Sequence, residues 1–236
     1  MDKRSLIKAI AAVPFAGVGL QAAAQQAPFK IGFITPMTGP FASTGKQMEA
    51  GARLYMAQNG ITVAGRKIEF ILKDDAGTPD QTKRIAQELL VNDKVDVLAG
   101  FGLTPLALAV APLATQSKTP MVNMLAATSA VIDASPYMIR VSMTLPQITL
   151  GIADWAPKNK IKKVVTMVSD YGPGIDAERT FRDRFIFNGG QIVESIRVPV
   201  RNPDFAPFLQ KVRDLSPDAL FVFVPSGIGA AVMKQF

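Results

Sequence analysis

KIGFITPMTGPFASTGKQMEAGARLY, residues 30–55, is the stretch that decides the fold of this 236-residue chain. Residues 31–35 form a short apolar run without helical spacing, which predicts a buried β-strand. After a loop of Pro, Gly and small hydroxyl residues, Thr44 and Gln47 have the spacing of a capping box, which predicts a helix that ends near Gly60. A strand that leads into a helix through a loop at its carboxyl end is where open α/β sheets bind ligands.

The same loop does not match the nucleotide-binding motifs. Five residues separate Gly39 from Gly45, whereas a phosphate-binding loop has four, and Gln47 stands where a Mg²⁺-binding Ser or Thr is required. No Gly-x-Gly-x-x-Gly follows the strand, so a dinucleotide fingerprint is absent as well. We therefore expect a ligand other than a nucleotide, and no cofactor.

The composition excludes several classes of function. The sequence contains no Cys and no His, which removes thiol catalysis, the commonest general base and the commonest metal ligand. The formal net charge is +7, but the basic residues are dispersed rather than clustered with aromatics, so no nucleic-acid partner is expected. An acidic pair, Asp74 and Asp75, is interpreted as accepting hydrogen bonds from nearby backbone, and no metal site is predicted.

Residues 1–24 have the pattern of a cleavable secretory signal peptide. Lys3 and Arg4 precede an apolar run at residues 9–20, and three small residues follow at 22–24. This order is typical of an export signal and predicts a periplasmic protein. The basic residues resemble a twin-arginine signal only faintly, so Sec and Tat export both remain open.

The remainder of the chain repeats the strand–loop–helix unit. Further strands are predicted at residues 67–73, 95–100, 120–124, 137–141, 163–169, 191–200 and 219–224, and helices are expected to begin at Thr78, Thr104, Leu145, Asp176, Asp204 and Ser226. Of these, Thr78, Thr104 and Asp204 are interpreted as helix caps. Strands that alternate with helices in this way predict doubly wound parallel sheets flanked by helices, an α/β fold.

The repeat restarts around residues 141–146, which predicts two lobes. The expected boundaries are 28–143 for an N-terminal α/β lobe and 144–236 for a second α/β lobe. No low-complexity linker divides them, so the joint is interpreted as a hinge.

Several motifs, in this order and spacing, carry a family resemblance. They are residues 34–40 with Gly45, 73–76, 98–100 before Thr104, 126–128, 171–172 and 203–205. The chain resembles type I periplasmic solute-binding proteins of the branched-chain amino-acid, leucine-binding protein-like, ABC transporter family. The resemblance implies a two-lobed clamshell that closes on a small solute and delivers it to a membrane permease. Members of that family are longer, so we expect a C-terminally truncated chain with an incomplete second lobe.

Thr104 is the leading candidate binding residue. Its hydroxyl is predicted at a strand's carboxyl end and a helix's N-terminus, where free backbone N–H groups and the helix dipole favour an anion such as a carboxylate. The family's carboxylate-binding Ser or Thr falls at this position. The alternative is that Thr104 only caps the helix.

The resemblance implies five further ligand-binding residues. Ala126 would contribute its backbone carbonyl and Thr128 its hydroxyl, although an ordinary small-residue turn explains both. Tyr171 would cover the ligand from the second lobe. Thr44 matches a family contact position but is also explained by its capping box, and Ser226 is the weakest candidate.

These observations favour an extracytoplasmic solute-binding component of an ABC importer, a monomer that is not an enzyme. Its solute would be a small carboxylate, either a branched-chain amino acid or a similar amino, aromatic or aliphatic acid. The choice stays open because the family's acidic partner for a ligand ammonium group is expected beyond Phe236. The alternative is a ligand-sensing clamshell domain of a receptor or regulatory protein, since a fold alone does not settle function.

Overall fold

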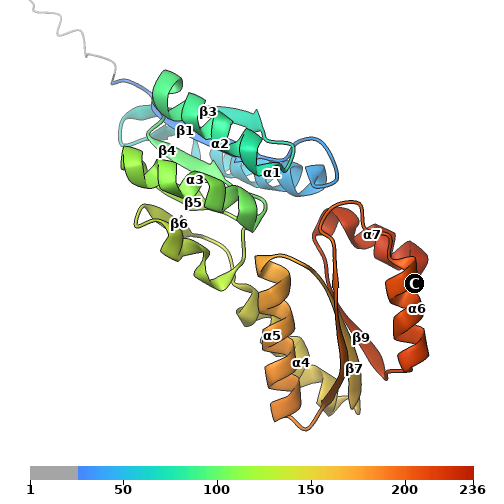
Figure 1. The fold of residues 1–236 in the computed structure, drawn as a ribbon. Coiled ribbons are helices and arrows are strands. Elements are labelled where there is room, and N and C mark those ends of the chain that lie inside the picture. Colours follow the sequence, from blue (N-terminus) through green and yellow to red (C-terminus); the bar gives the residue numbers. More distant parts are fainter. Residues whose placement is uncertain (1–25) are drawn as a thin grey trace, which may run out of the picture.

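The computed structural model describes residues 26–236, and the predicted signal peptide at 1–24 lies outside them. The chain forms two lobes, each built on its own β-sheet (Figure 1). The first sheet has six strands in the order β2-β3-β1-β4-β5-β6, and the second has three in the order β8-β7-β9. All neighbouring strands are parallel except β2 and β3. The predicted doubly wound α/β pattern is therefore confirmed.

The first lobe contains residues up to β6. Its strands are β1 (Phe29–Thr35), β2 (Thr62–Val63), β3 (Arg66–Asp74), β4 (Val97–Gly100), β5 (Met121–Asn123) and β6 (Met138–Arg140). Its helices are α1 (Ala42–Asn59), α2 (Pro79–Glu88) with the π-helical turn η1 (Leu89–Asp93), α3 (Thr104–Ser117) and the 3₁₀ helix η2 (Ser129–Ala134). Gly100 ends β4 at a φ of +116°, and a Cβ there would lie 2.1 Å from the Ile34 carbonyl oxygen, so only Gly fits.

The second lobe contains the remaining elements. Its strands are β7 (Lys163–Ser169), β8 (Gln191–Val198) and β9 (Ala219–Phe223), and its helices are α4 (Leu145–Lys158), α5 (Gly172–Phe187), α6 (Ala206–Leu215) and α7 (Ser226–Gln235). Alternate residues of the central strand β7 face opposite cores. Val165 and Met167 pack in one core with Leu209 of α6 and Val232 of α7, whereas Val164 packs in another with Phe181 of α5. Both faces of β7 are thus covered, as its continuous apolar run predicts.

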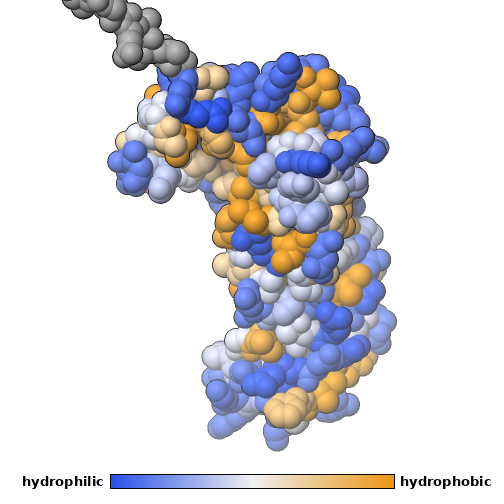
Figure 2. Space-filling model, turned by 90° about the vertical axis from the view of Figure 1, so that its left-hand side faces the viewer, coloured by the Kyte–Doolittle hydropathy of each residue, from blue (hydrophilic) through white to orange (hydrophobic). Residues whose placement is uncertain are grey.

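The described chain crosses between the lobes once, between β6 and α4. Figure 2 shows a narrow waist between the two lobes, with apolar side chains gathered there. Val141 and Met143 of this crossing segment are 61% and 53% exposed. Within residues 26–236, every helix is too short or too polar to span a bilayer.

At three predicted helix starts the expected side-chain capping bond does not form. The hydroxyls of Thr44 and Thr78 make no cap hydrogen bond, and α1 already begins at Ala42. Thr104 is the first residue of α3 and Leu103 is its N-cap, again without a side-chain cap bond. Each of these hydroxyls bonds elsewhere: Thr44 to Ser226, Thr78 to the Asp75 carbonyl and Thr104 to Thr128. For Thr44 and Thr104 a tertiary partner has replaced the local capping bond, whereas the Thr78 hydroxyl bonds the carbonyl of a residue three positions earlier.

Two other starts are shifted. Helix α5 begins at Gly172, four residues before the predicted Asp176, because Pro173 fits the first turn of a helix, where no backbone N–H is needed. Phe205 is the N-cap of α6, although the Asp204 carboxylate does accept a hydrogen bond of 3.1 Å from the Ala206 N–H.

Candidate functional site

A cavity of about 210 Å³ lies between the two lobes. The first lobe contributes Phe41, Thr44, Leu103, Thr104 and Ala126, and the second contributes Tyr171, Phe223 and Ser226. The cavity lies beyond the carboxyl ends of β4, β7 and β9, where parallel sheets place ligands. Five of the six residues predicted from the sequence therefore line one cavity: Thr44, Thr104, Ala126, Tyr171 and Ser226.

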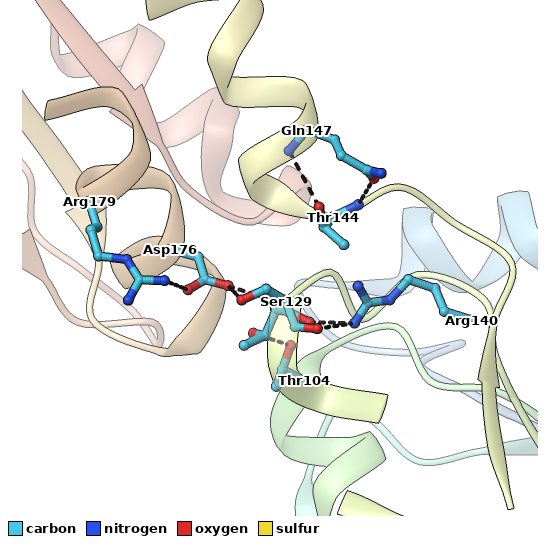
Figure 3. A network of polar contacts seen from close by, with 8 residues as sticks. Thr104, Ser129, Arg140, Thr144, Gln147, Asp176 and Arg179 are labelled. Carbon is cyan, nitrogen blue, oxygen red and sulfur yellow. Dashed lines mark hydrogen bonds and ion pairs between the residues drawn. The ribbon is translucent and has the colours of Figure 1, made fainter. Parts of the chain in front are cut away.

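The sixth, Thr128, does not line the cavity directly. Its hydroxyl oxygen lies 2.9 Å from that of Thr104, a residue that is only 3% exposed (Figure 3). One of the two hydroxyls donates its hydrogen to the other. The hydrogen of the second hydroxyl then stays available to donate to a ligand or to a neighbouring acceptor. Thr128 thereby orients the Thr104 hydroxyl from behind.

The lobes touch at the Thr44 end of the cavity. The hydroxyl oxygens of Thr44 and Ser226 lie 2.7 Å apart, across a separation of 182 residues in the chain. Nearby, the Arg201 guanidinium donates a 2.7 Å hydrogen bond to the Gly77 carbonyl of the first lobe. The cavity is therefore bridged by polar contacts between the lobes, which is the arrangement of a closed clamshell.

Most of the cavity wall is apolar. Tyr171 and Phe223 stack with ring centroids 6.5 Å apart, and the remaining large apolar side chains are Phe41, Leu103, Leu125, Met143, Leu145 and Ile148. Burial raises the pKa of Tyr171, so its phenol stays protonated and able to donate a hydrogen bond. A mostly apolar cavity with a few hydroxyl groups is the usual composition of a small-molecule site.

Sequence reasoning missed these apolar wall residues. Each lies close to a strand's carboxyl end or a helix's first turn, but an apolar residue there is equally typical of ordinary core. Only the pairing of two lobes shows which apolar residues face a cavity and which face a sheet.

Five helices begin at the cavity: α1, α3, α4, α5 and α7. The first turns of a helix carry free N–H groups and the positive end of its dipole. None of these five helices has an acidic residue in its first turn. No charged side chain from residues 26–236 lines the cavity. These helix starts therefore present N–H donors and partial positive charge to the cavity, with no formal charge among its described lining residues.

Asp74 and Asp75 lie at the end of β3 and serve the loops beside the cavity. The Asp74 carboxylate accepts hydrogen bonds from the N–H groups of Met37 (2.8 Å) and Ala76 (2.8 Å) and from the Thr38 hydroxyl (2.6 Å). Asp75 is fully buried and accepts from the Gly77 N–H (2.9 Å) and the Thr82 hydroxyl (3.0 Å). The interpretation of both carboxylates as acceptors for local hydrogen bonds is confirmed.

Comparison with known proteins identifies the family. A profile of the periplasmic binding protein family matches residues 28–236, and the chain belongs to this family. It is 44% identical over 223 residues to the Leu/Ile/Val-binding protein homolog 6 of Brucella abortus, which covers 94% of this chain and 57% of that relative.

Solved structures of similar sequence share the fold. A solute-binding protein of an ABC transporter from Rhodopseudomonas palustris BisB5, in complex with 3,4-dihydroxybenzoic acid, is 61% identical with a TM-score of 0.86, covering 89% of this chain and 58% of that one. A solute-binding protein from R. palustris in complex with 4-hydroxybenzoate is 41% identical with a TM-score of 0.85, covering 89% and 57%.

The predicted family and the type I periplasmic binding fold are thus confirmed. The expectation that this chain is shorter than its relatives also holds, since it spans 57% of the Brucella relative's length.

Proposed function

We propose that the protein is the extracytoplasmic solute-binding component of an ABC importer and that its solute is a small aromatic carboxylate. The observation that carries this proposal is the interlobe cavity, in which five helices begin and to which residues 26–236 contribute no charged side chain. Each helix start favours a nearby anion by about 0.3–1 kcal/mol. The same field disfavours an ammonium group, for which the described lining offers no carboxylate.

The size and walls of the cavity support an aromatic ring. An apolar protein cavity of about 150 Å³ is enough to bind benzene, and this one measures about 210 Å³. A ring lying against Tyr171 and Phe223 would place its carboxylate at the start of α3, beside Thr104. The R. palustris relatives in complex with 3,4-dihydroxybenzoic acid and 4-hydroxybenzoate support the same ligand class.

The roles of the site residues follow from this pose. Thr104 donates to the carboxylate, Thr128 orients the Thr104 hydroxyl, and the loop at Ala126 closes the cavity beside it. Tyr171 covers the ring from the second lobe. The bridged hydroxyls of Thr44 and Ser226 offer hydrogen bonds to polar ring substituents.

The test is thermal unfolding of the full-length protein with matched ligands. We expect 4-hydroxybenzoate to raise the midpoint, because a ligand at about 100 times its dissociation constant adds about 2.7 kcal/mol of stability. The neutral isostere 4-hydroxybenzamide tests the need for an anion, and leucine tests the tolerance of an ammonium group. Stabilisation by leucine or the benzamide equal to that by 4-hydroxybenzoate would contradict the proposal.

The remaining features of the proposal concern the protein in its cell. Residues 28–143 and 144–236 are the two lobes, the signal at 1–24 directs export to the periplasm, and the loaded monomer delivers its solute to permease subunits without chemical change. Stimulation of the reconstituted transporter's ATPase by the loaded protein would distinguish this role from the alternative of a sensing domain.

A further inference from the structure

A buried carboxylate of the second lobe lies against the first lobe beside the candidate ligand site. Asp176 belongs to α5, and its side chain is 10% exposed. Its Oδ2 atom accepts two hydrogen bonds from Ser129, one from the backbone N–H at 2.7 Å and one from the side-chain hydroxyl at 2.8 Å (Figure 3). These bonds join residues that are 47 positions apart and lie on different lobes.

Ser129 directly follows Thr128, so one peptide unit separates the contact from the residue that orients the Thr104 hydroxyl. On the opposite side of that peptide, the guanidinium of the half-buried Arg140 donates to the carbonyl oxygens of Thr128 and Ser129 (Figure 3). The Thr128 hydroxyl in turn contacts that of Thr104. The backbone that positions Thr128 is thus held by Arg140 within its own lobe and by Asp176 from the other lobe.

The start of α5 also packs closely against the Thr128 side chain. A Cβ placed on Gly172, at the start of α5, would lie 2.7 Å from the Thr128 hydroxyl oxygen. Glycine therefore lets the first turn of α5 reach Thr128, while Asp176, four residues later, receives the hydrogen bonds from Ser129.

Nothing within the second lobe requires a buried carboxylate at this place. Asp176 lies beyond the first turn of α5 and does not cap it, and its charged partner within α5 is Arg179 at 3.3 Å, whose side chain is 60% exposed. The positive charge that faces Asp176 from the first lobe is that of Arg140. A buried carboxylate without hydrogen bonds would be costly, but when the lobes separate, water can replace both bonds from Ser129. The contact can therefore form and break with lobe closure.

We propose that Asp176 is a positioning residue that couples lobe closure to ligand binding by fixing the Ser129 peptide, and hence Thr128 and Thr104, only in the closed form. This proposal rests on the proposed function, because it takes the interlobe cavity as the ligand site. The closed state is stabilised by the Asp176–Ser129 contact, and it is also the state in which a ligand binds Thr104. Because both interactions favour the same state, they are coupled.

The first test compares Asp176→Asn with Asp183→Asn in the full-length protein. Both variants remove one negative charge from α5, but Asp183 is exposed, and within residues 26–236 it pairs only with its neighbour Arg182. By calorimetry with 4-hydroxybenzoate, we expect Asp176→Asn to weaken binding about tenfold or more, a change of about 1.4 kcal/mol, and Asp183→Asn to leave the affinity within about twofold. Without ligand, the free energy of unfolding of Asp176→Asn should fall by less than its free energy of binding does, since the contact stabilises only the fraction of molecules that is closed.

Equal affinities of the two variants would overturn the proposal. So would a loss of affinity in Asp176→Asn that is accompanied by an equal loss of ligand-free stability, because that result would indicate an ordinary structural role.

A second measurement does not depend on the ligand's identity. The sequence contains no Cys, so spin labels can be placed at Lys83→Cys on α2 and Asp214→Cys on α6, both exposed. Distances between the two spin labels, measured by double electron–electron resonance, should show fewer closed molecules in Asp176→Asn than in the parent, even without ligand. An unchanged distance distribution would overturn the proposal, whereas failure of the unsubstituted protein to bind any aromatic acid would overturn the proposed function alone.

Discussion

Thr104 occupies the first position of α3, not the capping position before it, and its hydroxyl contacts Thr128 instead of the helix backbone. Its removal should therefore affect the ligand far more than the helix. Loss of a Thr that caps a helix, by contrast, lowers the helix's stability by about 1 kcal/mol.

Thr104→Val tests this point because it removes the hydroxyl and keeps the branched shape. A hydrogen bond to a charged group is worth about 1.5–3 kcal/mol, so 4-hydroxybenzoate should bind about 10- to 100-fold more weakly, as measured by calorimetry. The ligand-free midpoint should change little. Unchanged affinity would remove Thr104 from the site.

Asp74 and Asp75 are adjacent residues whose pKa values shift in opposite directions. Burial raises the pKa of Asp75 above its ordinary value of 3.8, against the opposing hydrogen bonds from Gly77 and Thr82. For Asp74, burial acts in the same upward direction, but hydrogen bonds from Thr38, Ala76 and Met37 together lower the pKa below 3.8.

The two carboxylates should therefore contribute to stability with opposite pH dependence. The free energy of unfolding of the parent, relative to Asp75→Asn, should be highest below pH 3.8 and decline as pH rises through the raised pKa. Relative to Asp74→Asn, it should be highest above pH 3.8 and decline as pH falls through the lowered pKa. Denaturant titrations between about pH 3 and pH 7 measure both differences. Parallel slopes for the two variants would contradict this assignment.

At the scale of elements, one helix has a complete capping box. The Thr144 hydroxyl accepts a hydrogen bond from the Gln147 N–H, and the Gln147 side chain accepts one from the Thr144 N–H at 2.8 Å (Figure 3). Helix α4 follows the single crossing between the lobes, so this box fixes where the second lobe begins.

Thr144→Ala should lower the free energy of unfolding by about 1 kcal/mol, because it removes a cap that satisfies the first turn of α4. Thr78→Ala is the matched control: Thr78 precedes α2 in the same way, but its side chain makes no cap bond. The Thr78 hydroxyl still donates to the Asp75 carbonyl at 3.1 Å, so its loss is expected to cost less. Equal denaturation midpoints for Thr144→Ala and the parent would show that this box contributes nothing.

At the scale of the whole molecule, closure depends on a backbone approach between α7 and the loop before α1. A Cβ on Gly227 would lie 1.7 Å from the Pro40 carbonyl oxygen of the other lobe. Backbone atoms cannot move aside as a flexible side chain can, so any side chain here must hold the lobes apart.

Gly227→Ala should therefore weaken ligand binding about tenfold or more, since an overpacked contact costs about 1–3 kcal/mol. Gly229→Ala is the control on the same helix, where an added Cβ has no atom within 4 Å. Calorimetry gives the affinities, and small-angle scattering should show that ligand compacts the control but not Gly227→Ala. Compaction of both variants would contradict the role of this contact in closure.

The sequence by itself determined the order of strands and helices and placed most of the candidate site. Its apolar runs predicted nearly every strand, and α4 and β7 have the bounds that their patterns predicted. Thr44, Thr104, Ala126, Tyr171 and Ser226 all line the interlobe cavity. Within each lobe they lie together because the carboxyl ends of parallel strands meet at the same edge of its sheet, whereas the facing of the two edges comes from the tertiary structure.

Only the tertiary structure decided what the hydroxyl and carboxylate side chains do. Thr44 has the spacing of a capping box, yet its hydroxyl bonds Ser226 of the other lobe, whereas the box that forms is the one at Thr144. Asp176 gives no sequence signal of its role, because Ser129 reaches it only when the lobes meet. Local spacing fixes backbone conformation within a few residues, but a polar side chain bonds whichever partner the fold brings near, and here that partner often belongs to the other lobe.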